Sequence, residues 1–217
     1  MNRRPPAPAP AEVTPVVYVV DDDQELRLAL DNLFRSVGLQ ARLFGSAAEF
    51  LKAGPGDAPG CLVLDIRLPG VSGLEFQGQL ARTGIDLPIV FMTGHGDVPM
   101  SVRAMKAGAV DFLTKPFRDQ DMLDAVSSAI EADRQRRAAA EAGRDVRARF
   151  ESLSPREREV MTLVTRGLMN KQVAGELGLS EITVKLYRAQ AMRKMGADTL
   201  ADLVRMAEHL ALHAGRG

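Results

Sequence analysis

Acidic residues cluster at the ends of apolar runs in the first half of this chain. Three consecutive aspartates, Asp21, Asp22 and Asp23, follow the run VVYVV, and Asp65 ends the run CLVLD. One aspartate after a strand is enough to cap the next helix, but neighbouring carboxylates repel each other unless a cation lies between them. An all-oxygen set without histidine or thiol favours Mg²⁺. The sequence therefore predicts a magnesium site formed by Asp21, Asp22 and Asp65, while Asp23 supplies first-turn charge to the following helix.

Two further polar side chains follow apolar runs later in the chain. Thr93 comes after LPIVFM and offers a hydroxyl, and Lys115 comes after AVDFLT and offers a positive charge in a loop that Pro116 stiffens. A cation, a lysine and a hydroxyl around one carboxylate form a site for a phosphoryl group, because each offsets charge on the transferred oxygens. Asp65 would then be the nucleophile. Each feature alone also fits a solvated turn or a helix cap, and it is their coincidence at four strand ends that favours the phosphoryl site.

The segments that must position these residues alternate between apolar runs and amphipathic stretches. The predicted strands are VVYVV (16–20), QARLF (40–44), CLVLD (61–65), LPIVFM (87–92) and AVDFL (109–113). Strands that alternate with helices predict βαβ units and an α/β fold with a doubly wound, five-stranded parallel sheet of order 2-1-3-4-5. Such sheets bind ligands outside the carboxyl ends of their strands, where the acidic residues, Thr93 and Lys115 all fall.

The second half of the chain has a helical pattern throughout. Residues 119–150 carry spaced apolar residues and one candidate break, Gly143, so we expect a long helix that completes the first domain and continues as a connector. The capping signature SPRERE then begins a helix that ends at Gly167. The expected organisation is a disordered tail (1–13), an α/β domain (14–130), a helical linker (131–150) and an all-α four-helix domain (151–217).

Composition limits the class of protein. The single cysteine, Cys61, excludes an intramolecular disulfide and is expected in the core, and no zinc spacing is present. The N-terminal stretch lacks the apolar run of a signal peptide and no later stretch could span a bilayer, so we expect a cytoplasmic protein. Residues 12–130 have a net charge of −6, whereas residues 131–150 and 151–217 each have +2. This asymmetry fits an acidic metal-binding domain joined to one that meets a polyanion.

The last domain contains a basic helix after a tight turn. A short helix in NKQVAGELGLS closes at Gly178, and Ser180 caps the longer one, whose residues 182–195 include four bases and no acid. We expect Val184, Tyr187 or Ala191, and Met195 to face inward and Lys185, Arg188 and Met192 to face outward. A short helix, a turn and a basic helix fit a recognition helix in the major groove of DNA, and the alternative is a solvated surface helix.

The first half of the sequence resembles a known family. The segments DDD, LVLDIRLPGVSG and FMTGHGDVPMSVRAMKAGAVDFLTKPF are similar to the flavodoxin-like receiver domain of bacterial two-component response regulators, most closely the FixJ-like branch, over nearly all of residues 14–130. The resemblance implies that a sensor histidine kinase phosphorylates Asp65. It also implies the following roles: Asp22 and Asp65 ligate Mg²⁺ directly, Asp21 ligates it mostly through water, the backbone carbonyl of Arg67 completes the set, Thr93 and Phe112 form the switch pair, and Lys115 is the invariant lysine.

The segment from LSPREREV to LVRMA resembles the LuxR-type four-helix DNA-binding domain along its whole length. The match implies that Lys171 and Thr183 contact phosphates and that Lys185, Leu186 and Arg188 lie in the groove. Ala189 departs from relatives that have a long polar residue there, which leaves the base specificity open.

Three other classes of protein share parts of this pattern. A phosphatase of the haloacid dehalogenase type needs a second aspartate two residues after the nucleophile, where this chain has Arg67. An autoinducer-binding LuxR protein would not require the acidic residues. A receiver whose helical tail binds only protein stays open, and the absence of GxxxxGK excludes an ATPase module.

We therefore expect a DNA-binding transcriptional response regulator rather than an enzyme. The expected partners are promoter DNA, a sensor histidine kinase and, after phosphorylation, a second copy of the chain; contact with RNA polymerase stays open, and no membrane partner is expected. The predicted dimer face comprises helix 97–107 and strand 109–113, with Val98, Met100, Met105 and Ala109.

Overall fold

The computed structural model describes residues 13–94 and 98–210. It divides into two compact units, Met1–Arg137 and Ala138–Gly217. The predicted N-terminal tail lies, apart from Val13, outside the described residues. No helix in the described part of the chain is long and apolar enough to cross a membrane.

The first unit contains a parallel sheet of five strands in the order β2-β1-β3-β6-β7. The strands are β1 (Val16–Val20), β2 (Gln40–Phe44), β3 (Gly60–Asp65), β6 (Ile89–Thr93) and β7 (Asp111–Thr114). The central strands β3 and β6 are buried at every residue, whereas the edge strands β2 and β7 are partly exposed. Continuous apolar runs are what a strand covered on both faces requires. The predicted α/β fold and strand order are confirmed.

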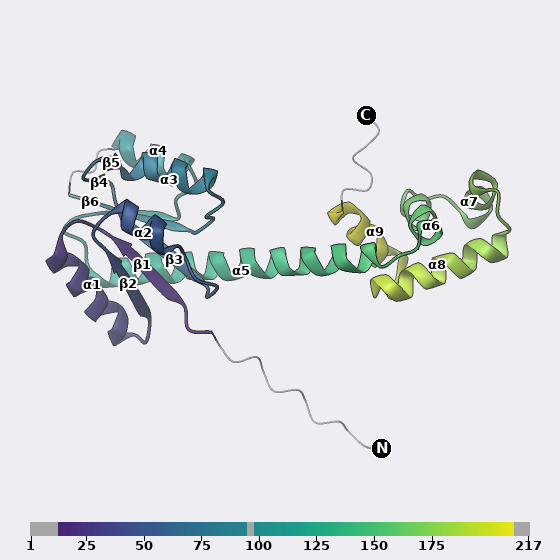
Figure 1. Cartoon of the computed structure of the whole chain (residues 1–217), viewed down its shortest axis with the longest axis horizontal. Coiled ribbons are helices and arrows are strands. Elements are labelled where there is room, and N and C mark those ends of the chain that lie inside the picture. Colours follow the sequence, from purple (N-terminus) through teal and green to yellow (C-terminus); the bar gives the residue numbers. More distant parts are fainter. Residues whose placement is uncertain (1–12, 95–97, 211–217) are drawn as a thin grey trace, which may run out of the picture. The chain divides into compact units, whose positions relative to one another are not determined.

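Helices cover both faces of this sheet (Figure 1). They are α1 (Gln24–Ser36), α2 (Ala47–Ala53), α3 (Gly73–Arg82), α4 (Val98–Lys106) and α5 (Asp119–Glu151). One face packs against α1 and α5, and the buried Cys61 lies in that layer, as expected. Burial and the nearby charge of Asp133 raise the pKa of the Cys61 thiol to about 12, so it stays protonated and acts as a small core side chain.

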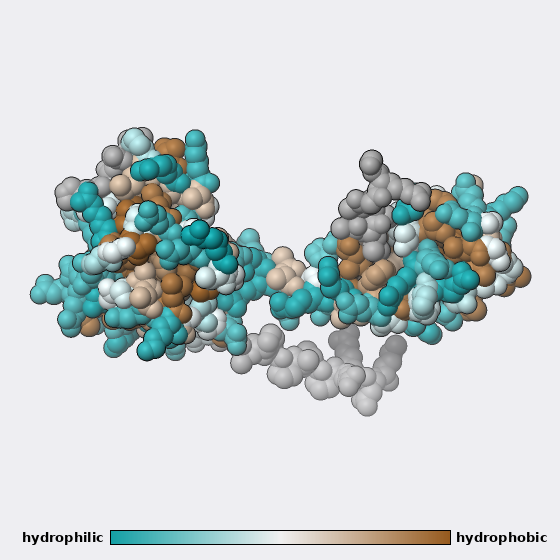
Figure 2. Space-filling model, turned by 45° about the horizontal axis from the view of Figure 1, so that its top comes forward, coloured by the Kyte–Doolittle hydropathy of each residue, from teal (hydrophilic) through white to brown (hydrophobic). Residues whose placement is uncertain are grey.

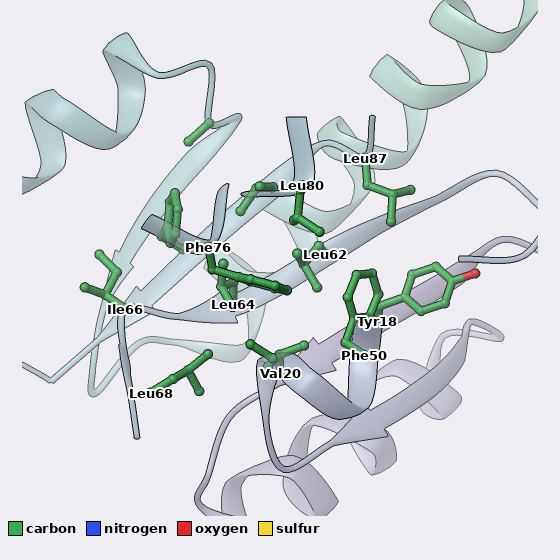
Figure 3. Close-up of a cluster of buried hydrophobic side chains, with 14 of the residues drawn as sticks. Tyr18, Val20, Phe50, Leu62, Leu64, Ile66, Leu68, Phe76, Leu80 and Leu87 are labelled. Atoms are coloured by element: carbon green, nitrogen blue, oxygen red, sulfur yellow. The ribbon is translucent and has the colours of Figure 1, made fainter. Parts of the chain in front are cut away.

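The other face packs against α2, α3 and α4 around a group of aromatic rings. Phe50 lies at its centre, with ring centroids 5.6 Å from Tyr18, 5.5 Å from Phe44 and 6.2 Å from Phe76, all in edge-to-face geometry (Figure 3). Such pairs are favourable beyond the area they bury. Val20 and Leu64 belong to this core and directly precede Asp21 and Asp65, so the core holds the strand ends that carry these acids.

The structure shows which residues of the predicted dimer face are exposed. Met100 is half-buried and packs against the core, and Ala109 is buried, whereas Met105 is exposed. Val102, which was not predicted, is also exposed, and the side chain of Val98 lies outside the described residues. Among the side chains of α4 that the structure describes, Val102 and Met105 are the large apolar ones that are exposed. Residues three apart on a helix share a face, and Met100 and Ala104 turn inward.

A buried acid ties α5 to the sheet. Asp133 has no solvent exposure, and it accepts hydrogen bonds from the Gly60 N–H at 2.9 Å, Arg136 Nε at 3.2 Å and Arg137 Nε at 2.6 Å. Burial works against its charge, but the two arginines and the Gly60 N–H outweigh burial and lower the pKa of Asp133. A glycine is also needed at position 60 where β3 pairs with β1, because a Cβ there would lie 2.3 Å from the carbonyl oxygen of Val16.

The second unit contains the end of α5 and four further helices in the described chain. These are α6 (Pro155–Thr165), α7 (Asn170–Leu177), α8 (Glu181–Met195) and α9 (Leu200–His209). The predicted capping residues are confirmed: Ser154 caps α6 in a capping box with Glu157, and Ser180 caps α8. Helix α5 runs through Gly143 without a break. The helices enclose a core of their own, as the all-α prediction requires.

Replacing Asp133 with alanine tests whether its network holds α5 to the sheet. The variant leaves the buried Gly60 N–H without its acceptor, so we expect the free energy of unfolding of the first unit to fall by about 1–3 kcal/mol. The Gly60 amide should also exchange faster in hydrogen-exchange mass spectrometry of the whole chain. Asp133→Asn is the matched control, because its amide oxygen still accepts this hydrogen bond. Equal exchange in the parent and in Asp133→Ala would contradict the assignment.

Candidate functional site

The carboxyl ends of the strands bring the predicted acidic residues together. Asp21 and Asp22 follow β1, and Asp65 ends β3, which pairs directly with β1. Carboxylate oxygens of all three lie within 4.8 Å of one another. Asp21 and Asp65 are buried, whereas Asp22 is exposed. Asp23 lies apart as the N-cap of α1, one position before the first turn where we expected it.

Lys115 provides the positive charge in this pocket. It follows β7, and its Nζ lies 2.7 Å from Asp21 Oδ2 and 3.6 Å from Asp65 Oδ1. Its backbone N–H donates to the Thr93 carbonyl at 2.7 Å, which fixes the loop against the end of β6. The sequence placed all these residues at strand ends, and the structure gathers them at one edge of the sheet.

Asp65 is electrostatically strained. Burial raises its pKa, and the charges of Asp21 and Asp22 raise it further, while Lys115 and the backbone N–H of Arg67 lower it. None of the described residues donates a hydrogen bond to its buried Oδ1. A buried oxygen without a donor, beside two other carboxylates, is a fitting ligand for a hard cation.

The chain turns sharply after Asp65 and returns to it. Arg67 begins a small antiparallel hairpin, β4 (Arg67–Leu68) and β5 (Val71–Ser72), which the sequence did not indicate. Gly73 then begins α3 and donates its N–H to the Ile66 carbonyl at 2.8 Å. A Cβ on Gly73 would lie 2.7 Å from the Asp65 carbonyl oxygen. The glycine therefore lets the backbone close around the acidic site.

Thr93 and Phe112 lie beside this site on neighbouring strands. Thr93 is buried at the end of β6, and Phe112 is half-buried on β7 and packs against the α4 side of the core. Side chains alternate along a strand, so Thr93 points to the same face as Phe91, which pairs in register with Phe112. The two residues thus share the layer that contains α4.

The outward face of α8 differs from the predicted one. Val184, Ala191 and Met195 are buried, as expected, and Tyr187 is half-buried. Lys185 is exposed, but Met192 is half-buried against the core and Arg188 is half-buried against the start of α7. The predicted outward face was wrong at Arg188 and Met192. The exposed positions on the side opposite the core are Ile182, Leu186, Ala189 and Arg193.

The other predicted contact residues lie at helix starts. Lys171 is exposed in the first turn of α7, and Thr183 lies in the first turn of α8, where its N–H donates to Ser180 Oγ at 3.1 Å. Arg188 Nη1 donates to Asn170 Oδ1 at 3.3 Å. This bond joins α8 to the start of α7, so Arg188 has a structural contact as well as a charge.

The C-terminal end of α8 is tied to two other helices. Lys194 Nζ lies 2.6 Å from Glu157 Oε2, and this buried carboxylate also accepts the Ser154 N–H at 2.6 Å. The hydrogen bond from Lys194 is the main reason that the pKa of Glu157 is lowered. Arg149 Nη1 donates to the Met195 carbonyl at 3.0 Å, where α8 ends. The sequence analysis counted Lys194 among the basic residues of the helix that faces DNA. In the structure, Lys194 instead forms an ion pair that joins α8 to α6.

The two halves of the chain match two family models. Residues 17–127 match the response regulator receiver domain, and residues 151–207 match the bacterial regulatory proteins of the luxR family. The chain belongs to the two-component response regulators, in the FixJ-like branch. Both matches are to regulatory domains, so this response regulator is a DNA-binding transcriptional regulator and not an enzyme.

Similar proteins cover most of the regulator. Nodulation protein W of Bradyrhizobium diazoefficiens is 59% identical over 204 residues, 94% of this chain and 90% of that protein. The transcriptional regulatory protein FixJ of the same species is 45% identical over 191 residues, 88% of this chain and 93% of that protein. The solved structure of the response regulator StyR is 49% identical and superimposes with a TM-score of 0.79, covering 90% of this chain and 98% of that one.

These matches bear on the three other classes of protein that the sequence analysis weighed. A receiver domain over residues 17–127 is inconsistent with an autoinducer-binding LuxR protein or a haloacid dehalogenase phosphatase. The luxR-family match over residues 151–207 favours DNA over a partner that is only protein. A receiver joined to a DNA-binding domain implies DNA and a sensor kinase as partners.

The ion pair between Glu157 and Lys194 gives a pH prediction. Because the folded pKa of Glu157 lies below its ordinary value of 4.5, its ionised form stabilises the fold above about pH 4.5, and this contribution is lost as the pH falls through the folded pKa. Lys194→Met should lower the stability of residues 138–217 by about 1–2 kcal/mol at neutral pH, since Lys194 is partly exposed. Its stability should also change less than that of the parent between about pH 5 and about pH 3.

Urea unfolding at several pH values measures both effects. Arg193→Met is the matched control, because Arg193 is exposed beside Lys194 on the same helix, and it should behave like the parent. If Lys194→Met and Arg193→Met give the same pH profile, the ion pair does not stabilise the domain.

Proposed function

We propose that Asp65 is the phosphoacceptor of this response regulator, that a sensor histidine kinase supplies the phosphoryl group, and that phosphorylation promotes dimerisation and promoter binding. The observation that carries the proposal is the position of the Asp65 carboxylate, buried beside two acids, 3.6 Å from Lys115 Nζ and with one oxygen that accepts no hydrogen bond from the described residues. We propose that residues 14–130 form the receiver domain, residues 131–150 the helical linker and residues 151–217 the DNA-binding domain.

The chemistry follows from these positions. A carboxylate oxygen of Asp65 attacks the phosphorus of the kinase phosphohistidine, the phosphorus–nitrogen bond breaks, and the imidazole leaves with the bonding electrons and takes up a proton. Lys115 is placed to neutralise an oxygen of the incoming group, and the Thr93 hydroxyl is placed to donate to another. Arg67 lies where a hydrolase would need a general acid, so only slow self-dephosphorylation is expected.

Mg²⁺ fits the donor set of this pocket. Asp22, Asp65 and the backbone carbonyl of Arg67 would hold it directly. Asp21 would act mostly through water, because its oxygens already accept from Lys115 at 2.7 Å and from the Asp23 N–H at 2.8 Å. A bound Mg²⁺ would offset negative charge on the transferred phosphoryl oxygens.

Asp65→Asn tests the phosphoacceptor. Incubation of the parent with acetyl phosphate and Mg²⁺ should add the mass of one phosphoryl group, and Asp65→Asn or chelation by EDTA should abolish the gain, because both remove a needed oxygen ligand or its cation. Asp23→Asn is the matched control, since Asp23 caps α1 and asparagine caps equally well. Phosphate uptake by Asp65→Asn at the parent rate would contradict the proposal.

Phosphorylation would act on the α4 surface through the switch pair. A phosphoryl group on Asp65 would draw Thr93 inward and vacate space into which Phe112 can turn, which repacks α4 against the sheet. Val102 and Met105, exposed on α4, would then pair with their copies in an isologous contact. The alternative is that phosphorylation only releases the DNA-binding domain from an inhibitory contact.

Isolated domains separate these accounts. We expect residues 1–137 to change from monomer to dimer with beryllofluoride, which stands in for the phosphoryl group, while residues 138–217 bind DNA weakly and independently of it. Analytical ultracentrifugation measures the change, and Asp65→Asn should stay monomeric throughout. A receiver that remains monomeric in both conditions favours release of inhibition.

The basic residues of the second unit give the DNA contacts. Lys171 and Thr183 would contact phosphates from the starts of α7 and α8, and Lys185, Leu186 and Arg188 would lie in the major groove. Support comes from the exposure of Lys171, Lys185 and Leu186. Such a regulator meets its kinase and promoter in the cytoplasm, where RNA polymerase is a further candidate partner.

Substitutions separate base contacts from phosphate contacts. Lys185→Ala and Arg188→Ala should each weaken specific binding by about 1–3 kcal/mol, whereas Lys171→Ala should weaken binding to all sequences and reduce the salt slope by about one. Arg205→Ala, an exposed base of α9, is the control and should change neither. Unchanged affinity in both α8 variants, measured by fluorescence anisotropy across salt concentrations, would remove α8 from the groove.

A further inference from the structure

The side of α8 that points away from the core is apolar where it should meet DNA. Ile182 is 80% exposed and Leu186, one turn later, is 56% exposed. On a helix of 3.6 residues per turn, Ile182, Leu186, Ala189 and Arg193 fall within about 60° of one another, opposite the buried Val184, Ala191 and Met195. We call the first three of these outward residues the apolar stripe. Figure 2 shows apolar surface of this kind between polar residues on the unit that contains α6 to α9.

If α8 lies in the major groove as proposed, the position of the apolar stripe puts it against the bases. Ile182 and Leu186 lie in the first two turns of α8, and the N-terminal residues of a recognition helix are the ones that meet base edges. The surroundings are cationic, because residues 182–195 contain no acid and Lys185 and Arg193 are exposed beside the stripe. A cationic surround suits a polyanion better than an uncharged protein face.

The major groove offers one apolar feature, the C5-methyl group of thymine. Isoleucine, leucine and alanine side chains cannot hydrogen-bond to the donors and acceptors of a G·C pair, so packing against those groups would bury them without partners at a cost. Packing against a thymine methyl buries apolar surface on both sides, which is favourable. Apolar side chains at these positions would therefore favour thymine and disfavour the hydrogen-bonding edges of guanine, cytosine and adenine.

We propose that the apolar stripe, and Ile182 in particular, selects thymines in the target sequence through their methyl groups. The inference rests on the proposed placement of α8 in the major groove and adds a chemical basis for specificity. Lys185, exposed beside the stripe, supplies hydrogen-bond donors that guanine accepts, whereas Arg188 lies nearer the buried side of α8. The target half-site should thus contain thymines that face the stripe, next to a base pair that the Lys185 side chain contacts.

Removal of single methyl groups from DNA tests the proposal. A duplex is first selected from random-sequence DNA by the full chain with acetyl phosphate and Mg²⁺, and each thymine is then replaced in turn by deoxyuridine, which keeps base pairing and lacks the methyl. For the parent, we expect about fourfold weaker binding at each contacted thymine, the loss that corresponds to one buried methyl group.

The variants assign each thymine to a residue. In Ile182→Ala the penalty at one thymine should vanish while the others remain, and Leu186→Ala should remove the penalty at a different thymine. Alanine favours the helix, so α8 should stay folded. Met169→Ala is the matched control, because Met169 is 68% exposed but lies before α7, outside the stripe, and it should leave every penalty intact. Ala189→Lys should convert one selected thymine position to guanine.

Each failure has a distinct meaning. A selected site without thymine, or deoxyuridine penalties that are the same in the parent and both stripe variants, overturns the proposal. A change in self-association in Ile182→Ala with unchanged penalties would assign the stripe to a second copy instead. If Lys185→Ala still weakens binding in these cases, only this inference fails; if it does not, the placement of α8 in the groove fails as well.

Discussion

A carboxylate with almost no access to water needs positive charge beside it, and that requirement at Asp65 organises the first half of the molecule. Asp65 is 6% exposed, and Asp21, with none of its surface exposed, is even less accessible. Among the described residues, only Lys115 forms ion pairs with them, at 2.7 Å from Asp21 and 3.6 Å from Asp65. One cation for three nearby carboxylates leaves a deficit, which a divalent ion or a phosphoryl group with its cation would fill. The pairing of β1 with β3 brings the three carboxylates together. Gly73 lets the backbone close beside Asp65.

The second half of the molecule holds α8, the proposed recognition helix, in a fixed position. Glu157 and Arg149 hold the end of α8, and Asn170 holds its middle through Arg188. A helix anchored at several points is preorganised, so little of its binding energy goes into ordering it. Phosphorylation can then raise the affinity for DNA by dimerisation, which brings two copies of α8 to one DNA site. Two linked weak contacts bind more tightly than one, without any new contact to DNA. The anchored α8 therefore supports the proposal that the regulated step is association of receivers rather than remodelling of α8.

Local signals made much of this architecture predictable from sequence. Strand periodicity gave the sheet, and the Ser154 and Ser180 caps gave two helix starts, because each depends on residues a few positions apart. The Asp133 network was not predictable, since its partner Gly60 lies 73 positions away. The ion pair of Glu157 with Lys194 spans 37 positions, and without it Lys194 looks like a DNA contact. The buried side of α8 was predicted correctly, but its outward side was misassigned at Arg188 and Met192, because both border the buried side and apolar residues occur all round that helix.

The central claim is that phosphorylation of Asp65 sets the affinity for DNA. Its most direct test is the dissociation constant of the full chain for a selected duplex, with and without beryllofluoride in the presence of Mg²⁺. The parent should bind more tightly by about tenfold or more with beryllofluoride, because a dimer engages two half-sites, and Asp65→Ala should show no difference. Equal affinity of the parent in the two conditions would contradict the account.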